Sequence, residues 1–206
     1  SIMSHNTPVR IHVSPSAPLL LALFVMLSSP LLLSALLLAA LCHELGHYWM
    51  LRRMRAGVTA IHVTALGAEM RVSGRLSYGG ELLAAAAGPV TNLLLALPLA
   101  YGGRLWEVLY LFAGAQLVLG VFNLLPILPL DGGSMLWNLL AWLTEPYTAD
   151  RIAGVVSFGM TSLLTLAAAA ALWKGGSPFL LLASVALLWH TITVNRGCQT
   201  TAKKVK

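Results

Sequence analysis

Residues 17–51 are almost entirely apolar, and this run constrains the fold more than any other feature of the sequence. A single helix over this run would be about 52 Å long, whereas the hydrocarbon core of a membrane is about 30 Å thick. The run must therefore be broken. Ser29 followed by Pro30 has the pattern of a helix N-cap with proline at the first helical position. We expect a short helix over about 16–28 and a second helix over about 30–52.

The composition indicates an integral membrane protein. Hydrophobic residues make up 58% of the chain and charged residues only 10%, whereas about a quarter of the residues in soluble domains are charged. The formal net charge of +6 alone would suggest a nucleic-acid partner. However, the basic residues lie in short loops beside apolar segments, which is typical of membrane topology. We therefore expect a lipid bilayer around the protein and no nucleic acid.

The remaining segments complete a helical membrane fold. Residues 58–73 are rich in β-branched residues and partly alternate, which indicates a short β-hairpin. Apolar periodicity and length predict further helices, over about 81–101, 105–125, 151–173 and 177–194, with an amphipathic helix over about 134–143. The expected fold class is an all-α polytopic membrane protein with about six transmembrane helices and a short β-hairpin between the second and third.

The distribution of positive charge predicts the orientation of the chain. With six spans, both termini lie on one side, and all of the 13 lysines and arginines except Arg104 and Lys174 fall on that side. Positively charged loops are typical of the cytoplasmic face. We therefore expect a cytoplasmic arm at 1–16 and a basic cytoplasmic tail at 195–206.

A short motif in the second expected helix indicates a metal site. His43, Glu44 and His47 form the pattern H-E-x-x-H. Histidines four residues apart lie on one face of a helix, so both imidazoles can bind one metal ion. Glu44 lies close enough to act on a metal-bound water. Ionisable residues in an apolar helix are costly and usually functional, so we interpret these three residues as a site and not as packing.

The third metal ligand has two candidates. A catalytic zinc needs three protein ligands and one open position. Asp131 is the stronger candidate, because it follows the fourth long helix at the expected depth of the histidines. There Pro126 and Pro129 prevent a regular helix and two glycines permit an unusual turn. Glu69, in the expected hairpin, is the rival.

These motifs together resemble the site-2 protease family of intramembrane zinc metalloproteases. The resemblance covers about residues 10–145, and it rests on three motifs in the same order: His43–His47, Gly88–Asn92, and Asn123–Gly133 with its Asn-Leu-Leu-Pro and Leu-Asp-Gly-Gly ends. It is greatest to the bacterial branch that contains the sporulation protease processing pro-sigma-K. That protease carries a C-terminal CBS domain, which we expect this chain to lack.

The resemblance implies a function and a role for each residue. It implies zinc held by His43, His47 and Asp131, Glu44 as the general base, and Asn92 and Asn123 in holding the substrate backbone or oxyanion. Residues 17–145 would form the catalytic membrane core, and residues 146–194 two further transmembrane helices. The expected activity is regulated intramembrane proteolysis near the cytoplasmic face of a bacterial inner membrane.

The expected partners follow from that activity. The substrate would be a membrane-tethered protein, such as a sigma-factor precursor, an anti-sigma factor or a signal-peptide remnant, and regulatory membrane proteins are further candidates. A helical substrate must unwind before attack, and a strand edge within 61–72 can pair with the unwound segment.

Two alternatives belong to other functional classes. A metal transporter or metal-binding membrane protein would need further ligands along a path through the bundle. Beyond the site residues, the later apolar helices carry almost no acidic residues, histidines or cysteines that could act as such ligands, apart from His190. An inactive scaffold that binds clients would not need a general base such as Glu44. Both alternatives are therefore less consistent with the sequence than a protease.

Overall fold

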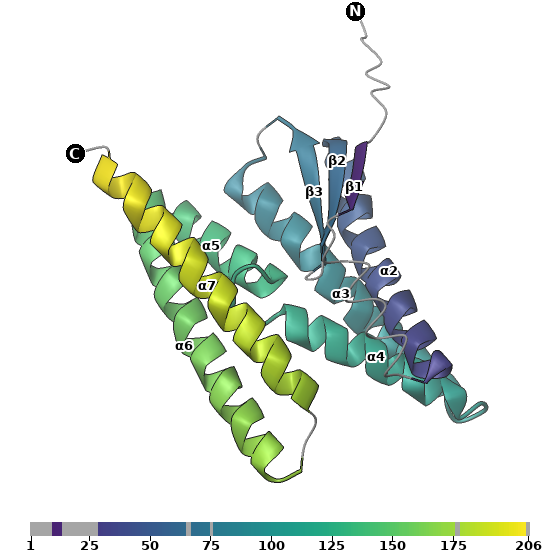
Figure 1. The fold of residues 1–206 in the computed structure, drawn as a ribbon. Coiled ribbons are helices and arrows are strands. Elements are labelled where there is room, and N and C mark those ends of the chain that lie inside the picture. The colour runs from purple at the N-terminus through teal and green to yellow at the C-terminus, as the bar shows by residue number, and fades with distance from the viewer. Residues whose placement is uncertain (1–9, 14–28, 65–66, 75, 176–177, 205–206) are drawn as a thin grey trace, which may run out of the picture. The chain divides into compact units, whose positions relative to one another are not determined.

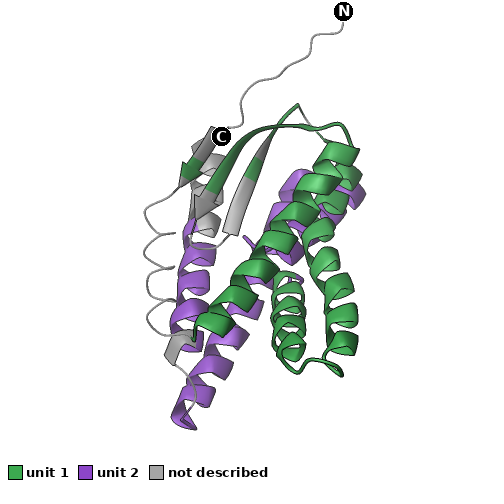
Figure 2. Ribbon diagram, turned by 90° about the vertical axis from the view of Figure 1, so that its right-hand side faces the viewer, with its two compact units in different colours: residues 1–123 green, residues 124–206 purple. Residues whose placement is uncertain are grey.

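The computed structural model describes residues 10–13, 29–64, 67–74, 76–175 and 178–204. These residues are mostly helical, with one small sheet (Figure 1). The chain divides into two compact units, residues 1–123 and 124–206, which are coloured separately in Figure 2. The short helix expected over 16–28 lies outside the described residues.

The first unit contains three packed helices and a three-stranded sheet. Its helices are α2 (Pro30–Arg53), α3 (Tyr78–Gly102) and α4 (Val108–Asn123), and each packs against the other two. Its strands are β1 (Arg10–Val13), β2 (Gly57–Thr64) and β3 (Gly67–Ser73). The expected helices over 30–52, 81–101 and 105–125 are therefore confirmed to within a few residues.

The start of α2 shows how the long apolar run is broken. The Ser29 side chain accepts a hydrogen bond from the Leu32 N–H at 3.3 Å, and Pro30 occupies the first turn, where its missing N–H leaves no donor unsatisfied. Small residues then let the three helices approach closely. Ala35 and Ala39 of α2 are buried in one cluster with Ala115 of α4. Gly46 lies so close to α3 that a Cβ there would overlap Thr91 Oγ1.

The sheet confirms the expected hairpin and adds a third strand. β2 and β3 pair antiparallel, and β1 pairs parallel with β2 in a register that places His12 beside His62. Their imidazole rings stack with centroids 4.8 Å apart. β1 lies in the segment that the sequence predicts as a polar arm, because four residues with a distant partner carry no local signal.

The strand order bears on the substrate-pairing edge expected within 61–72. β2 is the central strand, paired on both sides, and β1 and β3 are the outer strands. Within the expected range the outer edge therefore belongs to β3, and its pairing with substrate stays a prediction.

The second unit contains α5 (Asp131–Leu143), α6 (Pro146–Trp173) and α7 (Pro178–Lys204). α6 packs against both α5 and α7. α5 begins at Asp131, three residues before the expected start, so Gly132 and Gly133 belong to its first turn and not to an irregular turn. α7 continues to Lys204, whereas a helix ending near residue 194 was expected.

The apolar helices support an integral membrane protein. Among the described residues, α2, α3 and α6 are long and apolar enough to cross a membrane, and α4 and residues 180–193 of α7 are shorter apolar helices. Many large apolar side chains on these helices are exposed, which suits a lipid environment.

Candidate metal centre

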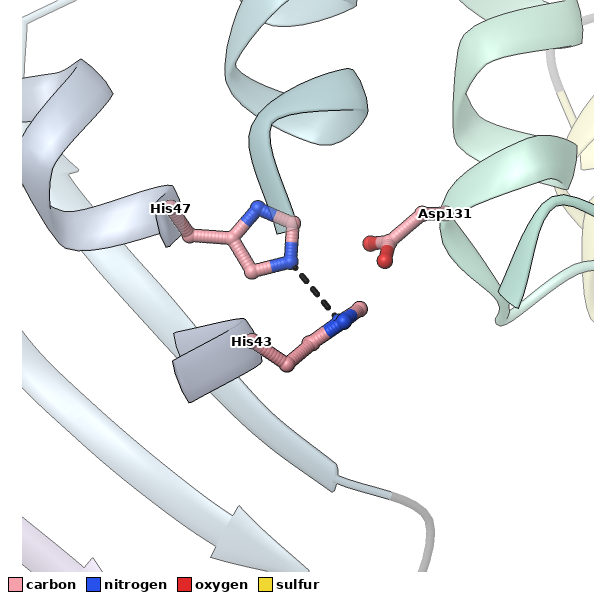
Figure 3. Close-up of side chains that lie close together, drawn as sticks. All are labelled: His43, His47 and Asp131. Carbon is pink, nitrogen blue, oxygen red and sulfur yellow. Dashed lines mark hydrogen bonds between the residues drawn. The ribbon is translucent and has the colours of Figure 1, made fainter. Parts of the chain in front are cut away.

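Two imidazoles from α2 form the centre of the candidate site. His43 and His47 lie one helical turn apart, and their rings stand nearly perpendicular at 82°. Their Nε2 atoms are 3.1 Å apart, as the dashed line in Figure 3 marks. His43 is buried and His47 is half-buried. The helical spacing of the motif therefore brings the two side chains together as predicted.

The partners of the other ring nitrogens define both tautomers. His47 Nδ1 lies 2.7 Å from the Ala84 carbonyl oxygen, which can only accept, so Nδ1 carries the proton. His43 Nδ1 lies 3.0 Å from Asn92 Oδ1. The Asn92 amide is itself oriented by α2, because its Nδ2 donates to the Ala39 carbonyl at 3.1 Å. Its Oδ1 must then accept from His43 Nδ1.

A shared metal ion fits this arrangement. The two Nε2 atoms, 3.1 Å apart, are close enough to be ligands of one ion. A tetrahedral zinc with Zn–N bonds of about 2.0–2.1 Å holds two ligand nitrogens about 3.3 Å apart. Fixed Nδ1–H groups that donate to oxygen acceptors are also the usual support for metal-binding histidines.

Gly88 of α3 preserves the space beside the imidazoles. A Cβ at this position would lie 2.6 Å from His47 Cε1 and 2.8 Å from His43 Cε1, and it would overlap His47 Nε2. No side chain other than that of glycine fits there without moving the histidines. The Gly-Pro dipeptide that carried part of the resemblance therefore has a steric explanation at its first residue.

Asn92 links three helices and is fully buried. Besides its contacts with His43 and Ala39 of α2, its Nδ2 donates to Gln116 Oε1 of α4 at 2.8 Å. The sequence analysis expected this side chain to hold substrate, whereas its partners in the structure belong to the protein. The substrate role stays a prediction.

Gln116 was not among the expected site residues. It is buried within α4, and its contact with Asn92 connects it indirectly to His43. A polar side chain in an otherwise apolar helix was the only sequence signal for it.

Glu44 and Asn123 occupy the places that their positions in the sequence indicate. Glu44 lies on α2 directly after His43 and is half-buried. Asn123 is the last residue of α4, and its Nδ2 donates to the Leu119 carbonyl of the same helix at 3.1 Å. The roles expected for both residues stay predictions.

Asp131 and Glu69, the two candidates for the third ligand, lie on different elements. Asp131 is the first residue of α5 in the second unit, and it is the third side chain drawn in Figure 3. A carboxylate in the first turn of a helix is stabilised by the helix dipole. Glu69 lies in β3, where its backbone is the partner of His62 in β2.

Comparisons with known proteins agree with this chemistry. The chain matches Peptidase family M50 over residues 100–167, a stretch that includes Asn123 and Asp131. Metalloproteases of this family use zinc. No curated protein matches the chain in sequence. The fold is similar to that of a site-2 protease from Methanocaldococcus jannaschii, with a TM-score of 0.70 and 22% sequence identity over 95% of this chain and 93% of that chain. Residues 100–167 are therefore similar to a metalloprotease family, and the fold of the chain is similar to that of a site-2 protease.

Proposed function

We propose that this protein hydrolyses peptide bonds of membrane-tethered proteins in a zinc site within the membrane. The observation that carries the proposal is the pair of imidazoles on α2, whose Nδ1 protons are both committed to oxygen acceptors. The two Nε2 atoms, 3.1 Å apart, would then bind one metal ion, with Glu44 on the same helix directly after His43.

Asp131 is the third ligand in this proposal. Three facts support it. Its carboxylate lies at a helix start, the segment before it is irregular, and it falls within the residues that match the metalloprotease family. Two histidines and one carboxylate form a ligand set typical of catalytic zinc, and they leave one position open.

The residues around the proposed zinc site have different roles in peptide-bond hydrolysis. A zinc ion held by His43, His47 and Asp131 would lower the pKa of a water molecule toward 7 and polarise the scissile carbonyl. Glu44 accepts a proton from the attacking water and passes it to the nitrogen of the leaving amine. Asn92 and Gln116 keep His43 in its tautomer, and the Ala84 carbonyl does the same for His47. Asn123 and Asn92 remain candidates to hold the substrate backbone.

An outer strand of the sheet is the proposed contact for the unwound substrate. β3 lies at the edge beside β2, and strand addition supplies main-chain hydrogen bonds without requiring a sequence motif. N–H groups alternate between the two sides of a strand, so Met70 or Arg71 directs its N–H away from β2. The two variants to compare are Met70→Pro and Arg71→Pro. The one that removes the outward N–H should impair cleavage and preserve zinc binding. Equal cleavage by both proline variants would eliminate this contact.

The proposed setting is a bacterial inner membrane, with six spans and both termini in the cytoplasm. The support is the concentration of lysine and arginine on one side of the expected spans. Cleavage would then occur near the cytoplasmic face and release sigma-factor precursors, anti-sigma factors or signal-peptide remnants, under the control of regulatory membrane proteins. Labelling of single cysteines from each side of sealed vesicles tests the orientation.

The decisive test is the zinc content of the purified protein. We expect about one zinc ion per chain in the wild type. We expect that zinc to be lost with Asp131→Asn and retained with Glu69→Gln. Loss with Glu69→Gln alone would move the third ligand into β3. Zinc binding without cleavage of any membrane-tethered substrate would favour the scaffold or transport alternative.

A further inference from the structure

The segment that leads into Asp131 has few bonds of its own. Residues 124–130 connect α4 to α5 and contain Pro126 and Pro129, which have no N–H groups to donate. Within the segment, the Ile127 N–H donates to the Leu125 carbonyl and the Leu130 N–H donates to the Ile127 carbonyl, both at 2.7 Å. Something else must therefore fix the middle of the segment, at Leu128.

A buried hydroxyl from α6 binds this middle position. Ser157 is 1% exposed, and its Oγ accepts a hydrogen bond from the Leu128 N–H at 3.0 Å. The same Oγ lies 3.5 Å from the Pro126 carbonyl oxygen, to which it donates weakly. One serine side chain thus satisfies backbone groups on both sides of Ile127.

A second buried hydroxyl, from α7, binds the other side of Leu128. Thr191 is 2% exposed, and its one hydroxyl hydrogen is shared between the Leu187 carbonyl of its own helix at 2.9 Å and, more weakly, the Leu128 carbonyl at 3.4 Å. The backbone N–H and the carbonyl of Leu128 are therefore held by two different helices.

Residues 124–130 pack directly against the first turn of α5, which carries Asp131. A Cβ on Gly132 would overlap the Leu124 carbonyl, and a Cβ on Gly133 would overlap the Ile127 carbonyl carbon. The first turn of α5 thus lies directly against the backbone of the segment, without side chains between them. A shift of Leu128 would displace the first turn of α5, which begins with Asp131 and Gly132.

We propose that Ser157 and Thr191 are positioning residues for the metal centre. They fix Leu128, and through it the backbone that carries Asp131. This makes α6 and α7, which provide no ligand, part of the support of the site. The proposal rests on the proposed function, because it assumes that Asp131 binds the metal.

The chain offers matched controls. Thr161 of α6 is fully buried, and its Oγ1 donates to the Ser157 and Phe158 carbonyls of its own helix. Ser184 of α7 is 1% exposed and donates to the Leu181 carbonyl of its own helix. Removal of either hydroxyl should leave residues 124–130 unchanged.

The first measurement is amide hydrogen exchange at Leu128 in zinc-free protein in nanodiscs. Ser157→Ala should increase the exchange rate there, because the N–H loses its acceptor, whereas Thr161→Val and Ser184→Ala should not. This readout depends on neither zinc nor activity. Unchanged exchange in Ser157→Ala would overturn the proposal.

The second measurement is zinc affinity, determined by competition with a chelator. Ser157→Ala and Thr191→Val should each weaken zinc binding on the order of ten-fold, as the loss of groups that support metal ligands typically does. Thr191→Ser, which retains the hydroxyl, should keep wild-type affinity. Asp131→Asn is measured in parallel. If Asp131→Asn loses zinc but the two hydroxyl variants bind it like their controls, the positioning role is wrong and the proposed function stands. If Asp131→Asn retains zinc, the proposed ligand set itself fails.

Discussion

Gly88→Ala should remove zinc binding while leaving the fold of the protein in place. Gly88 lies in the middle of α3, and the added methyl group would point at the two imidazoles of α2. Its carbon would lie 2.6 Å from His47 Cε1 and 2.8 Å from His43 Cε1. Both rings would have to move, because the methyl group has no rotamer that avoids them.

The size of that movement decides the effect on zinc. Carbon atoms in contact are separated by about 3.5 Å or more, so the rings must retreat by about 0.7–0.9 Å. Metal–ligand distances in protein sites are defined to about 0.2 Å. A displacement several times larger than this tolerance should weaken zinc binding by at least about 100-fold, the upper end of the effect seen when groups that orient a ligand are lost.

The effect on stability should be small, because two contributions oppose each other. Alanine in place of glycine inside a helix stabilises it by about 0.5–1 kcal/mol, whereas overpacking costs about 1–3 kcal/mol. The zinc-free variant should therefore differ from the zinc-free wild type by no more than about 2 kcal/mol in its free energy of unfolding.

The assay compares zinc affinity and thermal unfolding in the same detergent. Gly114→Ala is the matched control, because Gly114 also lies within an apolar helix and a Cβ there would meet no atom within 4 Å. It should retain zinc. If Gly88→Ala binds zinc as tightly as Gly114→Ala, the imidazoles are not held where the structure places them, and the argument from their geometry fails.

Three further predictions test other parts of the site. Asn92→Ala should weaken zinc binding on the order of ten-fold, because it releases His43, and Gln116→Leu should have a smaller effect of the same sign; chelator competition measures both. Glu44→Gln should retain zinc but lower the rate of substrate cleavage by at least about 100-fold, and a normal rate would exclude Glu44 as the base. Gly46→Ala should lower the temperature of unfolding, because its Cβ would meet the Ala87 carbonyl oxygen at 2.7 Å as well as Thr91, and the overpacking cost of about 1–3 kcal/mol should exceed the gain of about 0.5–1 kcal/mol from alanine inside a helix. An unchanged melting temperature would contradict the close packing of α2 and α3.

The sequence predicted the elements that are defined by local patterns. The start of α2 at Ser29 and Pro30, the hairpin, α3 and α4 each follow from nearby residues and lie close to the expected ranges, whereas α7 continues to Lys204, past its expected end near residue 194. β1 was missed because its partner β2 is distant in the sequence. The start of α5 was misplaced because Gly132 and Gly133 were interpreted as a turn, whereas glycine there allows close packing of a helix against the backbone before it.

The sequence also indicated the two candidate metal-ligating histidines but not what orients them. The spacing of His43 and His47 on a helix is a local property, so their proximity was predictable. The acceptors of their Nδ1 protons come from α3, and only the packing of α3 on α2 identifies them. The amide of Asn92 was noticed in the sequence, but its role was interpreted from the resemblance, and the structure gives it partners in α2 and α4.

Buried polar groups in these apolar helices are of two kinds, and only the structure separates them. Thr161 and Ser184 donate to carbonyls of their own helices, so they satisfy themselves wherever they occur. Asn92 and Ser157 instead bind the backbone or side chains of other elements, and Thr191 does so in addition to binding its own helix. A side chain of the first kind can be replaced by an apolar residue of similar shape at little cost, because both partners stay within one helix. Replacing one of the second kind leaves a buried group of another element without its partner, and each of these groups adjoins a proposed metal ligand or the segment leading to one. Replacements of the second kind should therefore lower zinc affinity more than replacements of the first kind. Depth of burial cannot explain such a difference, because all five side chains are buried to nearly the same extent.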